Sequence, residues 1–292
     1  MNDTFIMAGV MGWPIAHSRS PIIHNHWIEQ YELKGYYGLF PVEPHKLETA
    51  IRGLPALGIA GCNITIPHKV NAMKFMDWID PVARRIGAIN TVVTQHDGSL
   101  HGFNTDGFGF IASLKEAHPA WRANTGPSVI LGAGGAARSI IASLIDAGAI
   151  EIRLLNRTIQ NAKVLENEFA GIVKVYDWSQ RDTVLNECAL LVNTTSLGMH
   201  GQASLDIELK RLPTDSLVCD VIYVPLETPL LAAARERGNP TINGLGMLLH
   251  QARPAFNAWF GIMPEVTPLL RTTLINTLHP SNQDKRIFKQ LK

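Results

Sequence analysis

The chain has 292 residues, of which 46% are hydrophobic and 17% are charged, and its formal net charge is +1. This length suits two domains, and this composition is typical of an ordered globular protein. The nearly neutral charge gives no field that would attract nucleic acid or an anionic membrane, and no apolar run approaches the ~20 residues of a membrane span, so neither is expected as a partner.

Strand and helix signals alternate along the whole chain, which predicts an α/β fold. In the first part we expect strands over 5–11, 36–42 and 61–66, with a helix between the second and the third. Another helix should run over 21–34, with Ser20 as its N-cap and Pro21 in its first turn. The turn signal at 96–98 separates strands over 91–95 and 99–103, which predicts a hairpin. A helix over 107–117 follows.

The second part repeats the alternation after a break over 118–127. We expect strands over 128–131, 151–155, 172–176, 189–193, 217–221 and 240–242, and two final helices over 245–260 and 265–278. The polar, basic tail over 279–292 is predicted to be mobile. The second domain should begin near Gly107 and end near Asn243.

The three cysteines, Cys62, Cys188 and Cys219, are isolated in the sequence and form no CxxC motif. They predict buried, reduced thiols rather than a zinc ribbon or a disulfide framework. No lysine or arginine precedes Arg19, as a secretory signal would require, so a cytoplasmic location is expected. The histidines at 17, 24 and 26 have no acidic or thiolate cluster beside them, so we expect no metal. No heptad run sets the oligomeric state, which we expect to be a monomer or a homodimer.

The strand over 128–131 runs into Gly132-Ala133-Gly134-Gly135-Ala136-Ala137, the G-x-G-x-x-A form of a nucleotide-binding turn. Gly132 permits the tight turn, and Gly134 lets the backbone approach a pyrophosphate. The small Ala137 lets the following helix pack close to the sheet. Backbone N–H groups and the helix dipole would then hold the phosphates.

The next strand ends in Asn156-Arg157-Thr158. Sites for NAD usually carry an acidic side chain here, which binds the ribose 2′-hydroxyl. A guanidinium instead suits the 2′-phosphate of NADP, so the sequence predicts NADP as the cofactor. The structural alternative is a solvated arginine at a strand end.

Four polar motifs lie at predicted strand ends or helix starts of the first part, where sites of α/β proteins gather. They are His17-Ser18-Arg19-Ser20-Pro21, Asn63-Ile64-Thr65-Ile66-Pro67-His68-Lys69, Gly87-Ala88-Ile89-Asn90-Thr91 and Asn104-Thr105-Asp106-Gly107. Their amides and hydroxyls suit a small polyol acid, whose carboxylate could accept from Ser18 and Ser20. Hydride transfer to a ketone leaves an alkoxide, which Lys69 can protonate while Asp106 orients the ammonium.

Each of these residues also has a purely structural interpretation. Ser20, Thr105 and Asp106 stand where helix N-caps are expected. Lys69 taken singly is more often a solvated charge at a helix start. The functional interpretation therefore depends on the motifs acting together.

The four motifs, in this order and followed by Gly132–Ala137, resemble the shikimate dehydrogenase family from about Met7 to Leu278. Further segments that carry the resemblance are Asn193–Met199, Asp220–Tyr223 and Asn243–Gln251. The resemblance implies reversible NADPH-dependent reduction of 3-dehydroshikimate to shikimate in chorismate and aromatic amino acid biosynthesis. It also implies two domains: residues 1–106 with 244–292 would bind substrate, and residues 107–243 would form a Rossmann-like NADP domain.

The resemblance assigns site residues by motif match. The catalytic pair would be Lys69 and Asp106. The substrate-binding residues would be Ser18, Ser20, Asn63, Thr65, Lys69, Asn90, Asp106, Tyr223 and Gln251. The cofactor-binding residues would be Gly132, Ala133, Gly134, Gly135, Ala136, Asn156, Arg157, Thr158, Thr194, Thr195, Ser196, Met199, Val221, Gly244 and Met247.

One position departs from the family pattern. NADP-specific members often carry a second basic residue four positions after the arginine, where this chain has Asn161, and Lys163 follows. Discrimination against NAD is therefore expected to be weaker. The alternatives are a quinate/shikimate dehydrogenase that uses NAD, which Arg157 disfavours, and a non-catalytic ligand sensor. A sensor needs no proton donor beside a hydride acceptor, so the pair Lys69 and Asp106 favours an enzyme.

Overall fold

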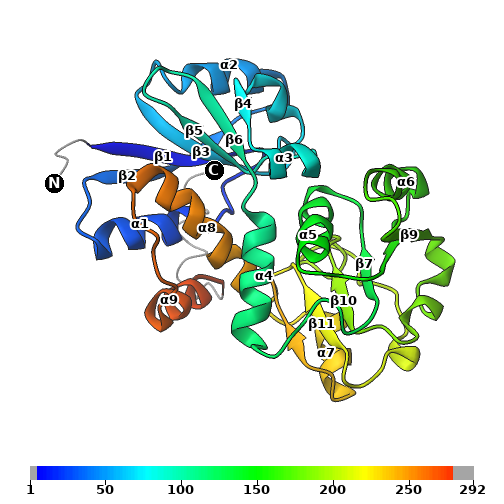
Figure 1. Ribbon diagram of the computed structural model, residues 1–292. Helices are drawn as coiled ribbons and strands as arrows, with labels where there is room; N and C mark the ends of the chain where they lie inside the picture. The colour runs from blue at the N-terminus through cyan, green and yellow to red at the C-terminus, as the bar shows by residue number, and fades with distance from the viewer. Residues whose placement is uncertain (1–4, 279–292) are drawn as a thin grey trace.

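The computed structural model describes residues 5–278, which form two six-stranded sheets with helices packed on them (Figure 1). The first sheet has the order β2-β1-β3-β5-β6-β4. Its strands are β1 (Ile6–Gly12), β2 (Gly35–Pro41), β3 (Ile59–Ile64), β4 (Trp78–Ile79), β5 (Thr91–Thr94) and β6 (Leu100–Phe103). The second has the order β12-β11-β10-β7-β8-β9, and its strands are β7 (Ser128–Leu131), β8 (Ile152–Leu155), β9 (Val173–Tyr176), β10 (Leu190–Asn193), β11 (Leu217–Asp220) and β12 (Thr241–Ile242).

The strand directions of the first sheet bring the polar motifs to one edge. β1 runs parallel to β3, and β5 runs antiparallel to both β3 and β6. The carboxyl ends of β1, β3 and β6 therefore meet the amino end of β5. In register, Asn63 at the end of β3 pairs with Thr91 at the start of β5, and Thr91 pairs with Phe103 at the end of β6.

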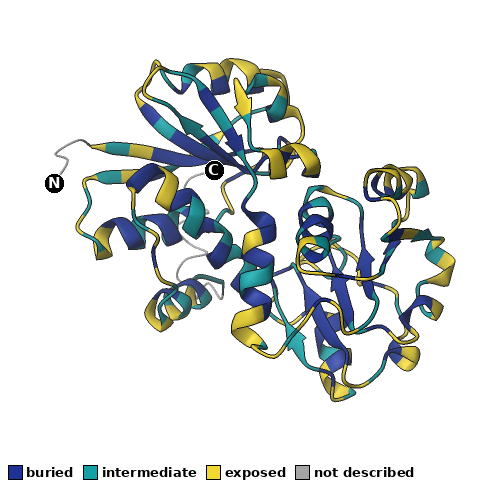
Figure 2. Ribbon diagram, viewed as in Figure 1, coloured by how far each residue is buried: buried dark blue, intermediate teal, exposed yellow. Residues whose placement is uncertain are grey.

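The second sheet is parallel throughout. The strand order reverses between β7 and β10, which is the point where doubly wound α/β proteins bind ligands. All four residues of β7, of β10 and of β11 are buried, as expected for a parallel sheet covered on both faces. Figure 2 shows these strands as the buried centre of their lobe.

Nine helices occur within residues 5–278: α1 (Ser20–Gln30), α2 (Leu47–Gly53), α3 (Pro81–Ile86), α4 (Asp106–Ala117), α5 (Gly135–Asp146), α6 (Ile159–Glu168), α7 (Pro229–Glu236), α8 (Leu245–Phe260) and α9 (Pro268–Leu278). Helices α4 and α8 lie side by side between the two sheets (Figure 1). A Cβ on Gly109 of α4 would lie only 2.6 Å from the Gln251 Cβ of α8. The two helices therefore approach closely because glycine stands at their contact.

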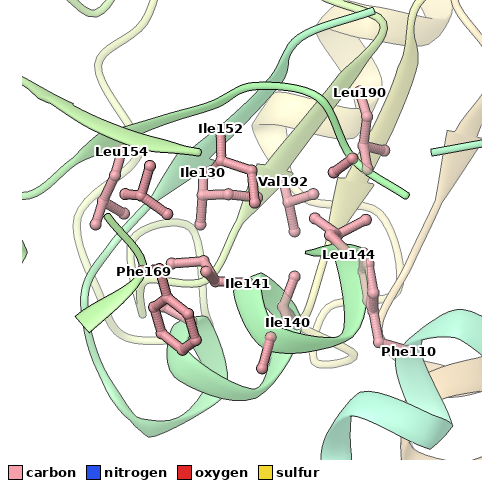
Figure 3. Packing of buried hydrophobic residues seen from close by; sticks show 14 of the residues in the cluster. Phe110, Ile130, Ile140, Ile141, Leu144, Ile152, Leu154, Phe169, Leu190 and Val192 are labelled. Carbon is pink, nitrogen blue, oxygen red and sulfur yellow. The ribbon is translucent and has the colours of Figure 1, made fainter. Parts of the chain in front are cut away.

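The last two helices pack on the first sheet rather than on the second. Their buried side chains, among them Phe256 and Leu270, share a core with Trp27 of α1 and Val10 of β1. The second sheet has its own core, in which α5 packs on β7, β8 and β10 (Figure 3). The chain thus leaves the first sheet, builds the second and returns.

The predicted elements are largely confirmed, with differences of a few residues. The helix expected over 21–34 ends at Gln30, because Glu32 adopts a left-handed φ of 52° and turns the chain. The N-cap prediction for Ser20 is wrong: Ser20 is the first helical residue, Arg19 precedes it, and no side chain caps the helix. The helix expected from 265 begins at Pro268. The tail over 279–292 lies outside the described residues.

Helix α3 and strand β4 had no counterpart in the prediction. Asp80 caps α3 by accepting from the N–H groups of Val82 and Ala83, at 2.9 and 3.2 Å, and β4 immediately precedes it.

All three cysteines are buried and free, as predicted. Within residues 5–278, no helix is long and apolar enough to cross a bilayer, and no cluster of three histidine, cysteine or acidic residues is arranged to hold a metal ion.

Candidate active site

A cavity of about 230 Å³ lies at the polar edge of the first sheet. Its wall comes from the loops after β1, β3 and β6, from the start of β5, and from α8. The nine residues that the sequence predicts as substrate ligands all line it: Ser18, Ser20, Asn63, Thr65, Lys69, Asn90, Asp106, Tyr223 and Gln251. Ala136, Val221, Gly244 and Met247, predicted near the cofactor, complete one side.

Lys69 and Asp106 form an ion pair in this cavity. Lys69 Nζ lies 2.5 Å from Asp106 Oδ2, and the two side chains are only 20% and 6% exposed. The backbone N–H of Asp106 donates to Asn104 Oδ1 at 3.0 Å, which fixes the start of α4. The alternative of a solvated Lys69 is therefore wrong: its ammonium is held by a buried carboxylate.

Asn90 connects this pair to the rest of the cavity. Its Nδ2 carries two protons and lies 2.8 Å from Asp106 Oδ1, 2.9 Å from Thr105 Oγ1 and 3.2 Å from Gln251 Oε1, so one proton is shared between two of these acceptors. Its Oδ1 accepts from the Thr105 N–H at 2.8 Å, and the Thr105 hydroxyl donates to the Gln251 carbonyl at 2.8 Å. Thr105 and Asp106 thus hold α8 and Lys69, and neither side chain caps α4.

Asn63 occupies the floor of the cavity and is buried. Its Nδ2 donates to the Asn90 carbonyl at 3.1 Å and to Thr91 Oγ1 at 3.2 Å. Its Oδ1 accepts from the Tyr37 hydroxyl at 2.6 Å. Tyr37 was not predicted to have any role in the site, and its position in the middle of an apolar strand gave no signal of one.

Three further side chains that line the cavity, those of Ser18, Ser20 and Tyr223, carry neutral hydroxyl groups. Ser18 Oγ accepts from the Ser20 N–H at 3.3 Å, so the loop after β1 folds on itself. Burial raises the pKa of Tyr223, and the charge of Arg19 offsets this only in part, so the phenol is a donor at neutral pH. His17 also lines the cavity, although the sequence suggested no substrate contact for it.

A second group of predicted residues lies at the carboxyl edge of the second sheet. Gly132, directly after β7, has a φ of 105°, which favours glycine. A Cβ there would lie 2.6 Å from Thr194 Oγ1, and this hydroxyl donates to the Leu131 carbonyl at 2.7 Å. The turns after β7 and β10 are therefore in contact at the point where the strand order reverses.

The turn before α5 can accept a phosphate group. A Cβ on Gly134 would meet no atom within 4 Å, so the backbone faces open space. Ala133 and Gly134 lead into α5, which begins at Gly135 with no side-chain cap. Its first N–H groups are thus available to an anion, and Ala137 is fully buried against the sheet.

The turn after β8 carries the predicted selector of the 2′-phosphate. Arg157 is exposed, and among residues 5–278 it has no hydrogen-bond or ion-pair partner. Asn156 Nδ2 donates to the Thr158 carbonyl at 2.8 Å, which shapes the turn around it. The free guanidinium fits a phosphate bound outside the strand end.

The turn after β10 holds the remaining predicted cofactor contacts. Asn193 Oδ1 accepts from the Thr195 hydroxyl at 2.7 Å and from its N–H at 3.0 Å. Ser196 and Met199 are exposed beyond this turn. The two sites adjoin each other, because Lys69 Cδ lies 3.7 Å from the position that a Cβ on Gly135 would occupy.

Three family models match successive parts of this chain. One described as shikimate dehydrogenase substrate binding domain matches residues 10–92, one described as shikimate / quinate 5-dehydrogenase matches 117–201, and one described as shikimate 5'-dehydrogenase C-terminal domain matches 244–272. The shikimate dehydrogenase (NADP(+)) of Paramagnetospirillum magneticum is 53% identical over 270 residues, which cover 92% of this chain and 98% of the relative.

Solved structures agree with these matches. A shikimate dehydrogenase in complex with NADP+ superposes with a TM-score of 0.87 at 36% identity, covering 94% of this chain and 96% of the other. The Thermus thermophilus shikimate 5-dehydrogenase in complex with NADP(H) and shikimate gives a TM-score of 0.83 at 33% identity, covering 94% and 100%. The chain belongs to the shikimate dehydrogenase family.

Proposed function

We propose that this chain is an NADP-dependent shikimate dehydrogenase, an oxidoreductase that reversibly reduces 3-dehydroshikimate to shikimate in the biosynthesis of chorismate and the aromatic amino acids. The observation that carries the proposal is the Lys69–Asp106 pair, 2.5 Å apart, in a cavity beside the glycine-rich turn before α5. The names of the relatives and the ligands of the solved structures support the same activity.

Substrate binding is proposed to use the two ends of the cavity differently. The hydroxyls of Ser18, Ser20 and Tyr223 would donate to the substrate carboxylate at one end. The amides, hydroxyl and carboxylate of the other end would hold the ring hydroxyls: Asn63, Thr65, Asn90, Asp106 and Gln251. A polar cavity of this size fits one small polyol acid.

The proposed chemistry needs one proton and one hydride. NADPH, when bound, supplies the hydride to the carbonyl carbon at C3. Lys69 donates its proton to the oxygen that becomes the alcohol, and Asp106 keeps the ammonium oriented and charged before transfer. In the reverse direction Lys69 accepts the proton from the substrate hydroxyl.

The proposed cofactor contacts divide among three turns. The backbone of residues 132–136 would hold the pyrophosphate, and residues 156–158 the adenosine 2′-phosphate. Thr194, Thr195, Ser196 and Met199 would line the groove between them. Val221, Gly244 and Met247, which line the cavity, would lie next to the nicotinamide.

The proposed domains follow this division of roles. Residues 1–106 with 244–292 would form the substrate domain and residues 107–243 the NADP domain, joined where α4 and α8 cross. We propose a cytoplasmic location, supported by three free, buried cysteines, and a monomeric or homodimeric state.

The test is the initial rate of nicotinamide reduction with shikimate or quinate, each combined with NADP or NAD. A rate dominated by shikimate with NADP supports the proposal. Comparable rates with quinate and NAD would assign the chain to the quinate/shikimate branch, which one matching family model also names. No rate with any pair would instead support a ligand sensor.

A further inference from the structure

Tyr37 lies behind the cavity wall and is fixed on every side. It is on β2 and is fully buried. The Asn25 side chain clamps its backbone, donating to the Tyr37 carbonyl and accepting from its N–H, both at 2.9 Å. Its hydroxyl donates to Asn63 Oδ1 at 2.6 Å. A phenol held this rigidly can determine how Asn63 presents itself to the cavity.

The Asn63 amide can adopt only one orientation. The carbonyl of Asn90 can only accept, so Asn63 Nδ2 must face it. Nδ2 also faces Thr91 Oγ1, so both of its protons are used. Oδ1 is thereby directed to Tyr37, which must be the donor. The lone pair that remains on Oδ1 is the hydrogen-bonding capacity left for a ligand.

The donors line up in one direction as far as the catalytic carboxylate. Tyr37 donates to Asn63, and Asn63 donates to Thr91. The Thr91 hydroxyl donates to Asn90 Oδ1 at 3.0 Å, and Asn90 donates to Asp106 Oδ1 at 2.8 Å. In a buried chain of this kind each hydrogen bond polarises the next.

The surroundings of the phenol keep its proton in place. His24 stacks on the Tyr37 ring with centroids 4.0 Å apart and planes 2° apart, and both of its ring nitrogens are buried without a partner among the residues that the structure describes. Burial lowers the pKa of His24 to about 3, so it is a neutral ring that does not take the proton. Burial raises the pKa of Tyr37 well above its ordinary value, and the nearby Cys62 adds to this increase.

We propose that Tyr37 is a positioning residue, which acts through Asn63 by fixing its amide as a hydrogen-bond acceptor for one substrate hydroxyl. This inference rests on the proposed function. It also assigns a selectivity to the site: a hydroxyl opposite Asn63 meets a lone pair, whereas a carbonyl or ether oxygen would set lone pair against lone pair.

The first experiment compares Tyr37→Phe with Tyr36→Phe. The first removes only the buried hydroxyl, and the second removes the hydroxyl of an exposed neighbour on the same strand. For Tyr37→Phe we expect kcat/KM for shikimate to fall about 5- to 30-fold, mainly through KM, because a buried acceptor loses its donor. The KM for NADP should stay within about two-fold, and Tyr36→Phe should resemble the wild type.

A double-mutant cycle tests whether Asn63 transmits the effect. In an Asn63→Ala background, Tyr37→Phe should cost less than about two-fold further. An equal loss in both backgrounds would overturn the inference, and so would a lower melting temperature with an unchanged KM, which is the mark of a structural role alone. Should Tyr37→Phe not fold, Thr91→Val interrupts the same chain one step later and is judged by the same criteria.

The controls separate this inference from the proposed function. A wild-type enzyme that turns over shikimate while Tyr37→Phe retains its KM refutes the positioning role alone. A wild-type protein that neither turns over shikimate nor gains thermal stability from it refutes the proposed function, and the positioning role with it.

Discussion

At the scale of single residues, the chemistry depends on how few charges the cavity contains. Lys69 and Asp106, the proposed catalytic pair, supply opposite charges, and the carboxylate accepts from Asn90 as well as from the ammonium. The neutral groups around them would bind hydroxyls without competing for the proton. The ion pair is therefore maintained by its surroundings rather than by solvent.

Replacing Lys69 by alanine should lower kcat by about 10²–10⁴-fold, the usual size of a general acid–base contribution, with a smaller effect on KM for shikimate. Steady-state kinetics measure both. The matched control is Lys74→Ala, an exposed lysine five positions later that does not line the cavity. Turnover of Lys69→Ala within a few fold of the wild type would show that another group donates the proton.

Replacing Arg157 by alanine should raise the KM for NADP by about ten-fold or more and leave the KM for NAD nearly unchanged, because only NADP carries the 2′-phosphate. Exposed Arg211, replaced by alanine, is the control for loss of a positive charge elsewhere. An equal loss for both cofactors would contradict a contact with the phosphate. Because Asn161 occupies the position of a second basic residue, the wild-type preference for NADP should rest largely on Arg157.

At the scale of elements, the crossing of α4 and α8 sets the position of Met247 and Gln251 in the wall of the cavity. A Cβ on Gly109 would approach the backbone of α8 at 2.7 Å, at both the Met247 carbonyl and the Gln251 nitrogen. A Cβ on Gly246 of α8 would lie even closer to Ser113 Oγ of α4. Met247 and Gln251 line the cavity, so a displacement of α8 moves the site.

Gly109→Ala should therefore lower the free energy of unfolding by about 1–3 kcal/mol through overpacking and also lower kcat/KM for shikimate. Chemical denaturation and kinetics on the same preparation measure the two effects. Gly53→Ala at the end of α2 is the control, because a Cβ there meets nothing within 4 Å. Wild-type stability and kinetics in Gly109→Ala would mean that the helix contact does not position the site.

At the scale of the whole molecule, the active site is the place where two independently built sheets meet. The first sheet contributes the proposed catalytic pair, and the second contributes the turn that precedes α5. Each has its own apolar core, and the last helices belong to the core of the first. The buried histidine of that core gives the stability of the whole molecule a pH dependence.

His24 should destabilise the fold in acid. Its folded-state pKa is lowered to about 3 by burial, whereas the unfolded chain binds the proton at the ordinary histidine pKa of 6.5. The part of the free energy of unfolding that depends on a neutral His24 is therefore fully present above pH 6.5. It is lost as the pH falls toward 3, by about 1.4 kcal/mol per pH unit. When His24→Phe is denatured at pH values from 4 to 7, the slope of its free energy of unfolding against pH should be smaller than that of the wild type by this amount. Exposed His96→Gln is the control, and an unchanged slope in His24→Phe would contradict the assignment.

The sequence by itself determined the alternation of strands and helices, the nucleotide turn and the types of group in the site. These features follow from local rules, since glycine at 132 is required by a positive φ and the arginine at 157 lies in the turn two residues after the end of β8. Helix α3 was also within reach of such rules, because Asp80, Pro81 and Gly87 stand at its cap, first turn and end.

Only the tertiary structure decided which polar groups form hydrogen bonds with each other. Tyr37 and Asn63 are 26 positions apart, and Asn90 and Gln251 are 161 apart, yet both pairs are hydrogen-bonded. Sheet register and the crossing of α4 and α8 create these contacts, and neither follows from local propensity. Ser20 is a further example: the local pattern predicts an N-cap, but Ser20 is the first residue of α1 and lines the cavity.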